Sequence, residues 1–304
     1  MYDALVSADV VADDPDAVAR GLVALFDLPE PRPSAFQEPP GHGFRAVWLR
    51  VQPSLAAAPT RIEVIGARPR NEPHDFVEER ITAQAPRPVR THATVLAADV
   101  PAVLEHLQRC GVRHRVTPPG ADIDFPRVWV GVSAEDPLAY DSGVDAGLWL
   151  EVVPTEKAGI PAPGPVAAAP EERGVLRVRA RRFLVADLDS AVQALHANLG
   201  LEHAEFSRDR DGARATYTFA NPRSAALELW HPSVDAAAGE FHRRWGPGPE
   251  AIVLEVGDLD HMAGLLDAKR VATRFATNTG GAAVLHVDSG STYAVPFELV
   301  QAGS

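Results

Sequence analysis

The chain has 304 residues, a formal net charge of −12 and 46% apolar residues. The negative charge argues against a nucleic-acid surface, which needs clustered basic residues. Cys110 is the only cysteine, so the sequence excludes a disulfide framework and a zinc site built from thiolates. At this length the chain can form two hydrophobic cores of ordinary size.

The start of the chain and its apolar runs indicate neither export nor a membrane partner. Residues 1–4 lack the basic segment and the continuous apolar stretch of a signal peptide. No run approaches the roughly 18 apolar residues that span a bilayer. We therefore expect a cytoplasmic protein.

The first two predicted units begin in the same way. In each, an apolar strand leads to an aspartate, Asp14 or Asp99, and an amphipathic helix follows. Aspartate is a good N-cap because its carboxylate accepts hydrogen bonds from the free amides of the first helical turn. Two later strands complete each unit. They are predicted at 44–51 and 61–65 in the first unit, and at 128–132 and 148–153 in the second.

The third unit shows the order of elements most clearly. A strand at 183–186 meets Asp187, and an amphipathic helix ends at Gly200, where a left-handed turn is expected. Strands at 214–219 and 226–230 follow, with a less distinct strand near 203–207. The fourth unit repeats this order after Asp258. Its later strands are predicted near 274–275, at 283–287 and at 295–300.

Each unit also ends on a glutamate between apolar neighbours. These glutamates are Glu63, Glu151, Glu228 and Glu298. Self-similarity at this spacing predicts a repeat architecture of four β-α-β-β-β units. One such unit cannot cover the concave face of its own sheet, so we expect an α+β fold in which paired units enclose two clefts.

A segment rich in proline, alanine and glycine lies between the two pairs of units. Because it has no apolar periodicity, its composition predicts a linker. We therefore predict an N-terminal domain, a linker and a C-terminal domain. Their bounds are 1–153 (units 1–67 and 88–153), 154–173, and 174–301 (units 174–231 and 248–301).

The four aspartate-led starts and four matching glutamates resemble the vicinal oxygen chelate superfamily. This superfamily includes glyoxalase I, bleomycin- and fosfomycin-resistance proteins and type I extradiol dioxygenases. The resemblance covers nearly the whole chain and implies four βαβββ modules paired into two glyoxalase-like cleft domains. In that family, the first strand carries a His or Gln ligand before the helix, and the glutamate of the last strand is the other ligand.

Counting back seven residues from Asp14, Asp99, Asp187 and Asp258 locates the expected first-strand ligands. The positions are Ser7, His92, Ala180 and Ala251. The resemblance therefore implies one metal site formed by His92, Glu151 and Glu63, with Ser7 or water near the fourth position. One imidazole and two carboxylates suit Mn²⁺, Fe²⁺, Mg²⁺ or Zn²⁺. No metal is expected at Glu228 and Glu298, which lack an imidazole.

Simpler interpretations of these residues remain open. A glutamate in a strand is often a solvated outer residue, and duplicated units keep a pattern after a site is lost. His92 could be a hydrogen-bonded histidine near a sheet edge. Four tryptophans on predicted strands could be core residues or a stacking surface for a flat aromatic ligand. They are Trp48, Trp129, Trp149 and Trp230.

A second resemblance, to the end of extradiol dioxygenases, is incomplete. His286, Tyr293, Pro296 and Glu298 follow the family's order. However, the spacing from proline to glutamate is too short, and alanines stand where both iron-binding histidines belong. An oxygen-activating iron needs two imidazoles and a carboxylate with open positions, so ring cleavage is not expected from these residues.

Two functions fit the sequence. In the first, a divalent metal in the N-terminal cleft chelates a small oxygenated substrate and stabilises an enolate or oxyanion, with Glu63 or Glu151 as the base. Such an enzyme would be of the lyase, isomerase or dioxygenase type. In the second, a metal-free protein sequesters a small hydrophobic or aromatic molecule in its two clefts, as bleomycin-resistance proteins do. Because four units supply both halves of each cleft, we expect a monomer or a loose homodimer.

Overall fold

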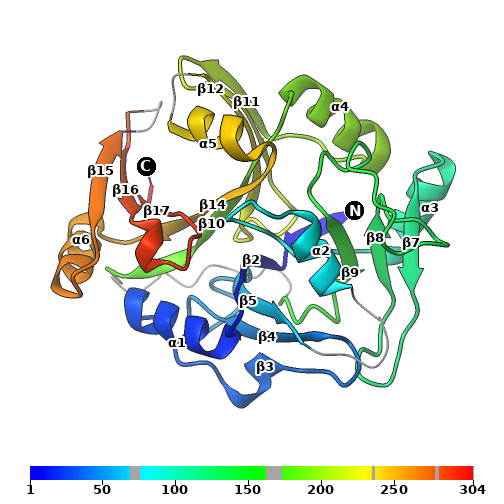
Figure 1. Ribbon diagram of the computed structural model, residues 1–304, viewed down its shortest axis with the longest axis horizontal. Helices are drawn as coiled ribbons and strands as arrows, with labels where there is room; N and C mark the ends of the chain where they lie inside the picture. The colour runs from blue at the N-terminus through cyan, green and yellow to red at the C-terminus, as the bar shows by residue number, and fades with distance from the viewer. Residues whose placement is uncertain (69–75, 162–172, 235–236, 278–280, 304) are drawn as a thin grey trace.

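The computed structural model describes residues 1–68, 76–161, 173–234, 237–277 and 281–303 (Figure 1). The fold is mixed α+β, and the described residues form six α-helices and three sheets. This arrangement is consistent with a glyoxalase-like fold. No helix of the described residues is long and apolar enough to cross a membrane.

Two sheets of the N-terminal half have the same internal strand order. In the first sheet this order is β2 (Ser7–Val11), β5 (Arg61–Ala67), β4 (Phe44–Leu49) and β3 (Phe36–Gln37). In the second it is β6 (Thr94–Ala98), β9 (Leu150–Pro154), β8 (Arg127–Val130) and β7 (His114–Thr117). In both sheets the first pair is parallel and the other pairs are antiparallel. Strand β1 (Tyr2–Leu5) adds to the second sheet beside β6.

One continuous sheet of eight strands forms the C-terminal half. One side consists of β10 (Val175–Leu184), β13 (Ala226–Pro232), β12 (Gly212–Tyr217) and β11 (Glu205–Asp209). The other consists of β14 (Gly248–Val256), β17 (Phe297–Gln301), β16 (Ala283–Val287) and β15 (Thr273–Thr277). The two sides join where β10 and β14 pair antiparallel. Each side again begins with one parallel pair.

The four predicted aspartate caps are present. The helices are α1 (Pro15–Phe26), α3 (Val100–Arg109), α4 (Leu188–Leu199) and α6 (Leu259–Ala268). The carboxylates of Asp14, Asp99, Asp187 and Asp258 accept an amide N–H three residues later, at 3.0, 3.2, 2.7 and 2.9 Å. Gly200 ends α4 in the left-handed region, at φ 63°. Two further helices, α2 (Val77–Ala83) and α5 (Ala237–Trp245), lie in the connections between units.

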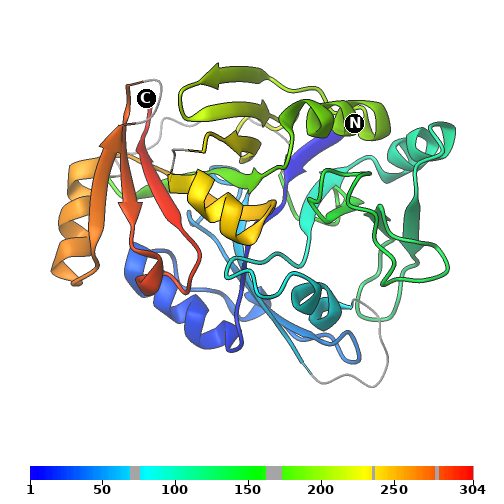
Figure 2. The same cartoon turned by 45° about the horizontal axis from the view of Figure 1, so that its top comes forward.

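The two halves are packed tightly against each other. One hydrophobic core contains buried residues from both halves, and Phe26 of α1 lies against Phe297 of β17 with ring centroids 5.0 Å apart. Figures 1 and 2 accordingly show α1 beside the last strands of the chain. Arg87 donates hydrogen bonds to backbone carbonyls between Trp245 and Pro249. Residues 162–172 of the predicted linker lie outside the described residues, and the domain bounds stay a prediction.

Candidate functional site

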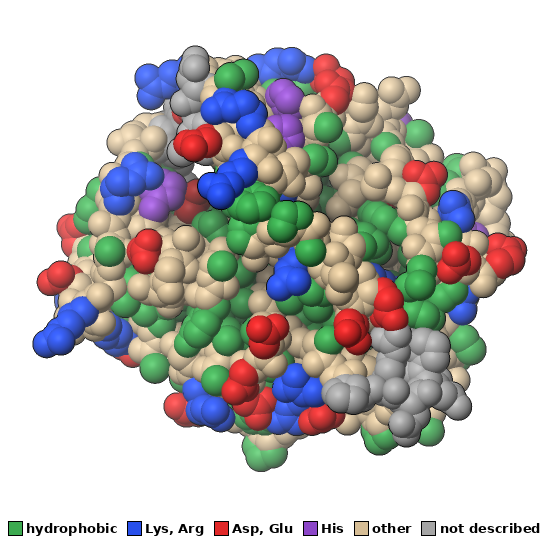
Figure 3. All heavy atoms as spheres, viewed as in Figure 1, with side chains coloured by type: hydrophobic (Ala, Val, Ile, Leu, Met, Phe, Trp, Pro, Cys, Tyr) green, Lys and Arg blue, Asp and Glu red, His purple; other side chains and the backbone are tan. Residues whose placement is uncertain are grey.

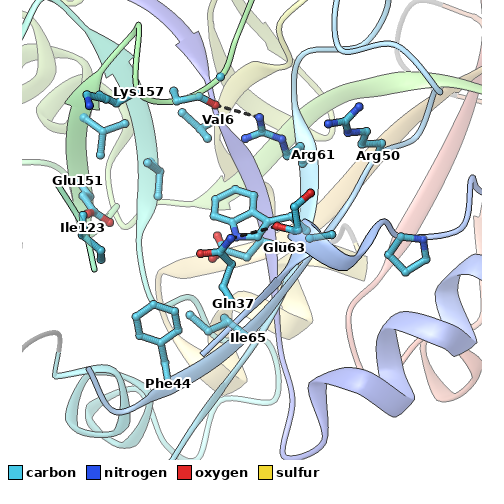
Figure 4. A pocket seen from close by; sticks show the side chains of 18 of the residues that line it. Val6, Gln37, Phe44, Arg50, Arg61, Glu63, Ile65, Ile123, Glu151 and Lys157 are labelled. Atoms are coloured by element: carbon cyan, nitrogen blue, oxygen red, sulfur yellow. Dashed lines mark hydrogen bonds between the residues drawn. The ribbon is translucent and has the colours of Figure 1, made fainter. Parts of the chain in front are cut away.

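A cavity of about 580 Å³ opens in the N-terminal half, within the range of small-molecule sites. All three predicted ligand residues line it, and Figure 4 shows Glu63 and Glu151 among the lining side chains. Glu63 comes from β5, Glu151 from β9, and His92 from the segment just before β6. Each is buried, with 3%, 5% and 6% of its surface exposed. The cavity thus gathers polar side chains from strands that are far apart in sequence.

The register of the strands explains this convergence. Glu63 pairs with Asp9 on one side and with Trp48 on the other. Glu151 pairs with Val95 and Trp129 in the same way. Because paired residues of neighbouring strands point to the same face of a sheet, each glutamate projects beside a tryptophan. Both glutamates and both tryptophans line the cavity.

His92 lies between two carboxylates. Its Nδ1 is 3.1 Å from Asp9 Oδ2, which also accepts the His92 backbone N–H at 2.7 Å. Its Nε2 is 3.9 Å from Oε2 of Glu63. Glu63 Oε2 accepts a hydrogen bond from the Ser7 hydroxyl at 3.0 Å. Asp9 therefore fixes the orientation of the imidazole, so that Nε2 faces Glu63.

The charges in this group are strongly perturbed. Burial raises the pKa of Glu63 to about 7, against the opposing effect of His92. Burial alone would lower the pKa of His92, but Glu63 and Asp9 raise it to about 9. Burial would raise the pKa of Asp9, yet its hydrogen bond with His92 and the charge of Arg181 lower it. Near neutral pH the imidazole is therefore cationic and faces a carboxyl group that titrates.

Arg181 connects this group to the C-terminal half. Its Nη2 lies 3.4 Å from Oδ1 of Asp9, and only 1% of the residue is exposed. A charge this deeply buried is costly unless it is paired. The Asp9 carboxylate thus pairs with two cations, His92 from the N-terminal half of the chain and Arg181 from the C-terminal half.

Aromatic and basic side chains form the remaining walls. Phe44, Trp48, Phe125 and Trp129 line the cavity. Arg61 and Arg50 lie on one side, and Glu151 and Lys157 on the other (Figure 4). Arg61 donates to the Ala158 carbonyl at 2.9 Å and lies over the Trp48 ring. Nη1 of Arg127 is 3.8 Å from Oε1 of Glu151. This lining suits a small molecule with an apolar part and an acidic or polar oxygen group.

The predicted metal site can be tested against this geometry. The donor types suit a divalent ion, and a carboxylate behind an imidazole often orients a metal ligand. As the side chains lie, however, no group of three or more carboxylate, imidazole or thiol residues in the described parts of the chain could hold one ion. The imidazolium form of His92 and the guanidinium beside Glu151 also oppose a cation. Ligation of a metal by His92, Glu151 and Glu63 stays a prediction.

The C-terminal half has a corresponding cavity of about 500 Å³. Glu228 and Glu298 line it, and a guanidinium connects them. Arg182 Nε is 2.9 Å from Glu228 Oε2, and its Nη1 is 2.9 Å from Glu298 Oε2 and 3.6 Å from Glu250 Oε2. These carboxylates keep the pKa of Arg182 well above its usual range. A protein cation thus lies among the C-terminal glutamates.

Three members of the dioxygenase-like series, His286, Pro296 and Glu298, line this cavity, and Tyr293 does not. His286 lies 3.5 Å from Glu298. The Tyr293 hydroxyl lies next to Gly21 of α1. Ala180 and Ala251 are fully buried and absent from the lining.

Sequence reasoning missed Glu250, Asp9, Arg127 and Arg182. Glu250 lies three residues before Val253, the partner of Glu298, just as His92 lies three residues before Val95, the partner of Glu151. Asp258 follows Val253 by five residues, whereas Asp99 follows Val95 by four. Counting back from the aspartates therefore gave Ala251, one residue too late. A charged residue inside an apolar strand was the available signal for Asp9, whereas Arg182 lies in a strand with three other arginines.

No family model and no curated protein matches the sequence. Among solved structures, methylmalonyl-CoA epimerase from Mycobacterium tuberculosis is similar, with 21% identity, a TM-score of 0.40, and coverage of 46% of this chain and 94% of that chain. A variant of the Streptomyces coelicolor epimerase in complex with 2-nitronate-propionyl-CoA has 20% identity, a TM-score of 0.39, and coverage of 43% and 99%. A hypothetical protein from Bacillus halodurans has 15% identity, a TM-score of 0.38, and coverage of 42% and 94%. Methylmalonyl-CoA epimerase is a member of the vicinal oxygen chelate superfamily.

Proposed function

We propose that this chain is a glyoxalase-like protein of four βαβββ modules, paired two by two, whose N-terminal cavity is the functional site. The repeated strand order and the capped helix of each unit support the modular arrangement. The pairing of units is supported by the antiparallel contact of β10 with β14 and by that of β1 with β6. Both cavities are lined by residues from two units.

The reaction that best fits the N-terminal cavity is proton transfer next to a carbonyl group, an isomerase-type step. The observation that carries it is the buried pair of Glu63 and His92, 3.9 Å apart and open to the cavity. The Glu63 carboxylate removes a proton from the carbon, and the bonding electrons move onto the carbonyl oxygen. His92 Nε2–H donates a hydrogen bond to that oxygen and stabilises the enolate. Return of the proton to carbon completes the isomerisation.

The environment of each group favours its assigned role. A general base works best when its pKa lies near the operating pH, and burial brings that of Glu63 to about 7. Asp9 keeps the His92 ring in place. Glu151 reaches the cavity from the strand equivalent to that of Glu63, so it is the second carboxylate available to return a proton from another side.

The walls define the substrate class. Arg61 and Arg50 offer a binding position for an acidic group, and Trp48 and Trp129 offer apolar surface. We therefore expect a small oxygenated compound that carries a carbonyl group, a short apolar segment and an anionic group. An aromatic ligand remains part of the proposal because stacking on the indole rings is possible in the same space.

Exchange of carbon-bound hydrogen tests the proposal. The protein is incubated in D₂O with a series of 2-oxo acids and hydroxyketones, and deuterium incorporation is followed by NMR. Glu63→Gln should lower the exchange rate by about 100-fold or more, the usual contribution of a general base. Glu228→Gln, the same change at the equivalent C-terminal position, is the matched control and should retain the rate. Equal exchange rates in Glu63→Gln and Glu228→Gln would show that Glu63 takes no part in the reaction.

A metal-free sequestering protein is the second candidate. It is favoured by the pairing of His92, Glu63 and Glu151 with protein groups, respectively Asp9, Ser7 and Arg127. Saturable binding of the same compounds without any deuterium incorporation would support sequestration against the isomerase. Metal content after purification without chelator, compared with a His92→Ala variant, tests the predicted metal site separately. A metal retained by the wild-type protein and lost in the variant would establish that site.

A further inference from the structure

Two arginines of the N-terminal cavity have no acidic partner. Arg50 and Arg61 line the cavity, and no carboxylate forms an ion pair with either in the parts of the chain that the structure describes. Arg61 donates a hydrogen bond to the Ala158 carbonyl at 2.9 Å, and Arg50 contacts the Pro53 carbonyl at 3.5 Å. A guanidinium has five N–H donors. Both side chains are only half-buried, so they keep donors that are open to the cavity.

Other basic side chains of the same cavity show the usual pairing. Nη1 of Arg127 lies 3.8 Å from Glu151, and Nζ of Lys157 lies 2.6 Å from Asp124. Figure 3 shows a similar pattern on the surface, where basic side chains lie next to acidic ones around α1 and β3. The two unpaired arginines depart from this pattern, and the departure requires a physical reason.

The register of β4 and β5 brings the two arginines together. The pairing of these strands ends with Leu49 opposite Ile62, and the next residues along the two strands are Arg50 and Arg61. The charge of Arg50 is close enough to destabilise the charged form of Arg61. Like charges directly opposite each other on neighbouring strands are unfavourable. An anion bound between the two guanidinium groups would remove this repulsion.

The pair of arginines faces the same space as the proposed base. Arg61 and Glu63 are two residues apart on β5, so their side chains point to the same face of the sheet, with Cα atoms about 7 Å apart. The guanidinium of Arg61 lies 5.2 Å from the centre of the Trp48 ring, which holds it against the cavity wall. A small molecule that reaches Glu63 can therefore place an anionic group at the two arginines.

We propose that Arg50 and Arg61 form a subsite for a doubly negative group of the substrate, a phosphate monoester. Guanidinium groups offer parallel N–H donors that match the oxygens of a phosphate. Two such groups balance two negative charges, whereas a carboxylate or a sulfate ester carries one charge and leaves one arginine unbalanced. This inference rests on the proposed function, because it specifies the anionic group of the compound on which Glu63 acts.

Two esters of similar shape test the charge of this group. Phenyl phosphate is a dianion at pH 8, since the second pKa of a phosphate ester is about 6. Phenyl sulfate is a monoanion, and phenol has the same ring without an anionic group. Binding of each compound to the full-length protein is measured by calorimetry at pH 8. Phenyl phosphate should bind at least tenfold more tightly than phenyl sulfate, and phenol should bind most weakly.

Three variants assign the binding to the two arginines. Arg50→Gln and Arg61→Gln should each weaken phenyl phosphate binding about tenfold or more, as expected for the loss of a hydrogen bond to a charged group. Each should also reduce the preference for phenyl phosphate over phenyl sulfate, because one cation remains. Arg20→Gln removes one exposed positive charge outside the cavity, so it is the matched control and should leave both affinities unchanged.

Three results would each overturn the subsite: no binding of phenyl phosphate, equal affinity for phenyl phosphate and phenyl sulfate, or wild-type affinity in folded Arg50→Gln. Arg50→Gln decides the test if Arg61→Gln does not fold. Glu63→Gln should bind phenyl phosphate at least as tightly as the wild-type protein, because a negative charge near Arg61 is removed. Phenyl phosphate binding without any deuterium exchange would therefore count against the proposed reaction and not against the subsite.

Discussion

The two cavities use equivalent positions of the repeat with opposite local charge. Glu63 lies beside β2 and Glu228 beside β10, and their partners on those strands are Asp9 and Arg182. In the N-terminal cavity the acidic partner supports the cation His92. In the C-terminal cavity the basic partner neutralises glutamates, and Glu250 stands at the position equivalent to His92. The residue beside the glutamate therefore determines whether a unit pair presents a free acid–base pair or a closed ion cluster.

Removal of the Arg182 guanidinium from the C-terminal cavity should have the largest effect on the free energy of unfolding. Arg182→Met leaves Glu228, Glu250 and Glu298 close together without their shared partner. Loss of one member of a buried ion pair typically costs about 3–5 kcal/mol, so the free energy of unfolding should fall by that order. Urea denaturation followed by circular dichroism measures it.

Two comparison variants make this prediction specific. Arg179→Met, on the same strand but with 45% of its side chain exposed, should cost less than about 1 kcal/mol. Arg182→Met combined with Glu298→Gln should recover part of the loss, because one of the opposing charges is gone. Equal losses of unfolding free energy in Arg182→Met and Arg179→Met would show that Arg182 does not neutralise the glutamates of the C-terminal cavity.

The two cavity histidines should titrate on opposite sides of the usual histidine pKa. For His92, Glu63 and Asp9 overcome the effect of burial and raise the pKa from 6.5 to about 9, a difference of about 3 kcal/mol between protonation states. For His286, burial lowers the pKa and outweighs Glu298. Imidazole resonances followed by NMR between pH 4 and 10 should show His286 losing its proton first.

Substitution of Glu63 tests whether this side chain raises the pKa of His92. Glu63→Gln removes a negative charge near His92, so the charged imidazole is less stabilised and its pKa should fall. Glu228→Gln, in the other cavity, should leave His92 unchanged. A His92 pKa that does not respond to Glu63→Gln would show that the two side chains are not coupled, which would also weaken the proposed acid–base pair.

The helix caps could be predicted from sequence because their signals are local. A capping aspartate, an apolar helix face and a glutamate between apolar residues each depend on neighbours within one element. The four caps at Asp14, Asp99, Asp187 and Asp258 are therefore confirmed. Glu63, His92 and Glu151 line one cavity, as expected from their equivalent positions in the first two predicted units.

The remaining site residues depend on register and on contacts between the halves. Glu250 was missed because one more residue separates the paired position from the helix cap in that unit. Arg181 pairs with Asp9, which is 172 positions away in the sequence. No local sequence pattern predicts such a contact. Arg182, its neighbour, points to the other face of the sheet, so one strand supplies a cation to each group of carboxylates.

The smallest expected effects concern the four caps, and they test how equivalent the units are. Each Asp→Ala substitution at 14, 99, 187 or 258 removes one side-chain hydrogen bond to the third helical amide. Such a loss costs about 1 kcal/mol. Asp13→Ala, next to the first cap but outside the helix and exposed, should change stability by less than about 0.5 kcal/mol. Urea denaturation of the five variants should therefore give four similar losses and one near zero. Because all four helices pack against one continuous core, the four losses should also appear in a single unfolding transition. Separate transitions for Asp14→Ala and Asp187→Ala would instead show that the two halves unfold independently.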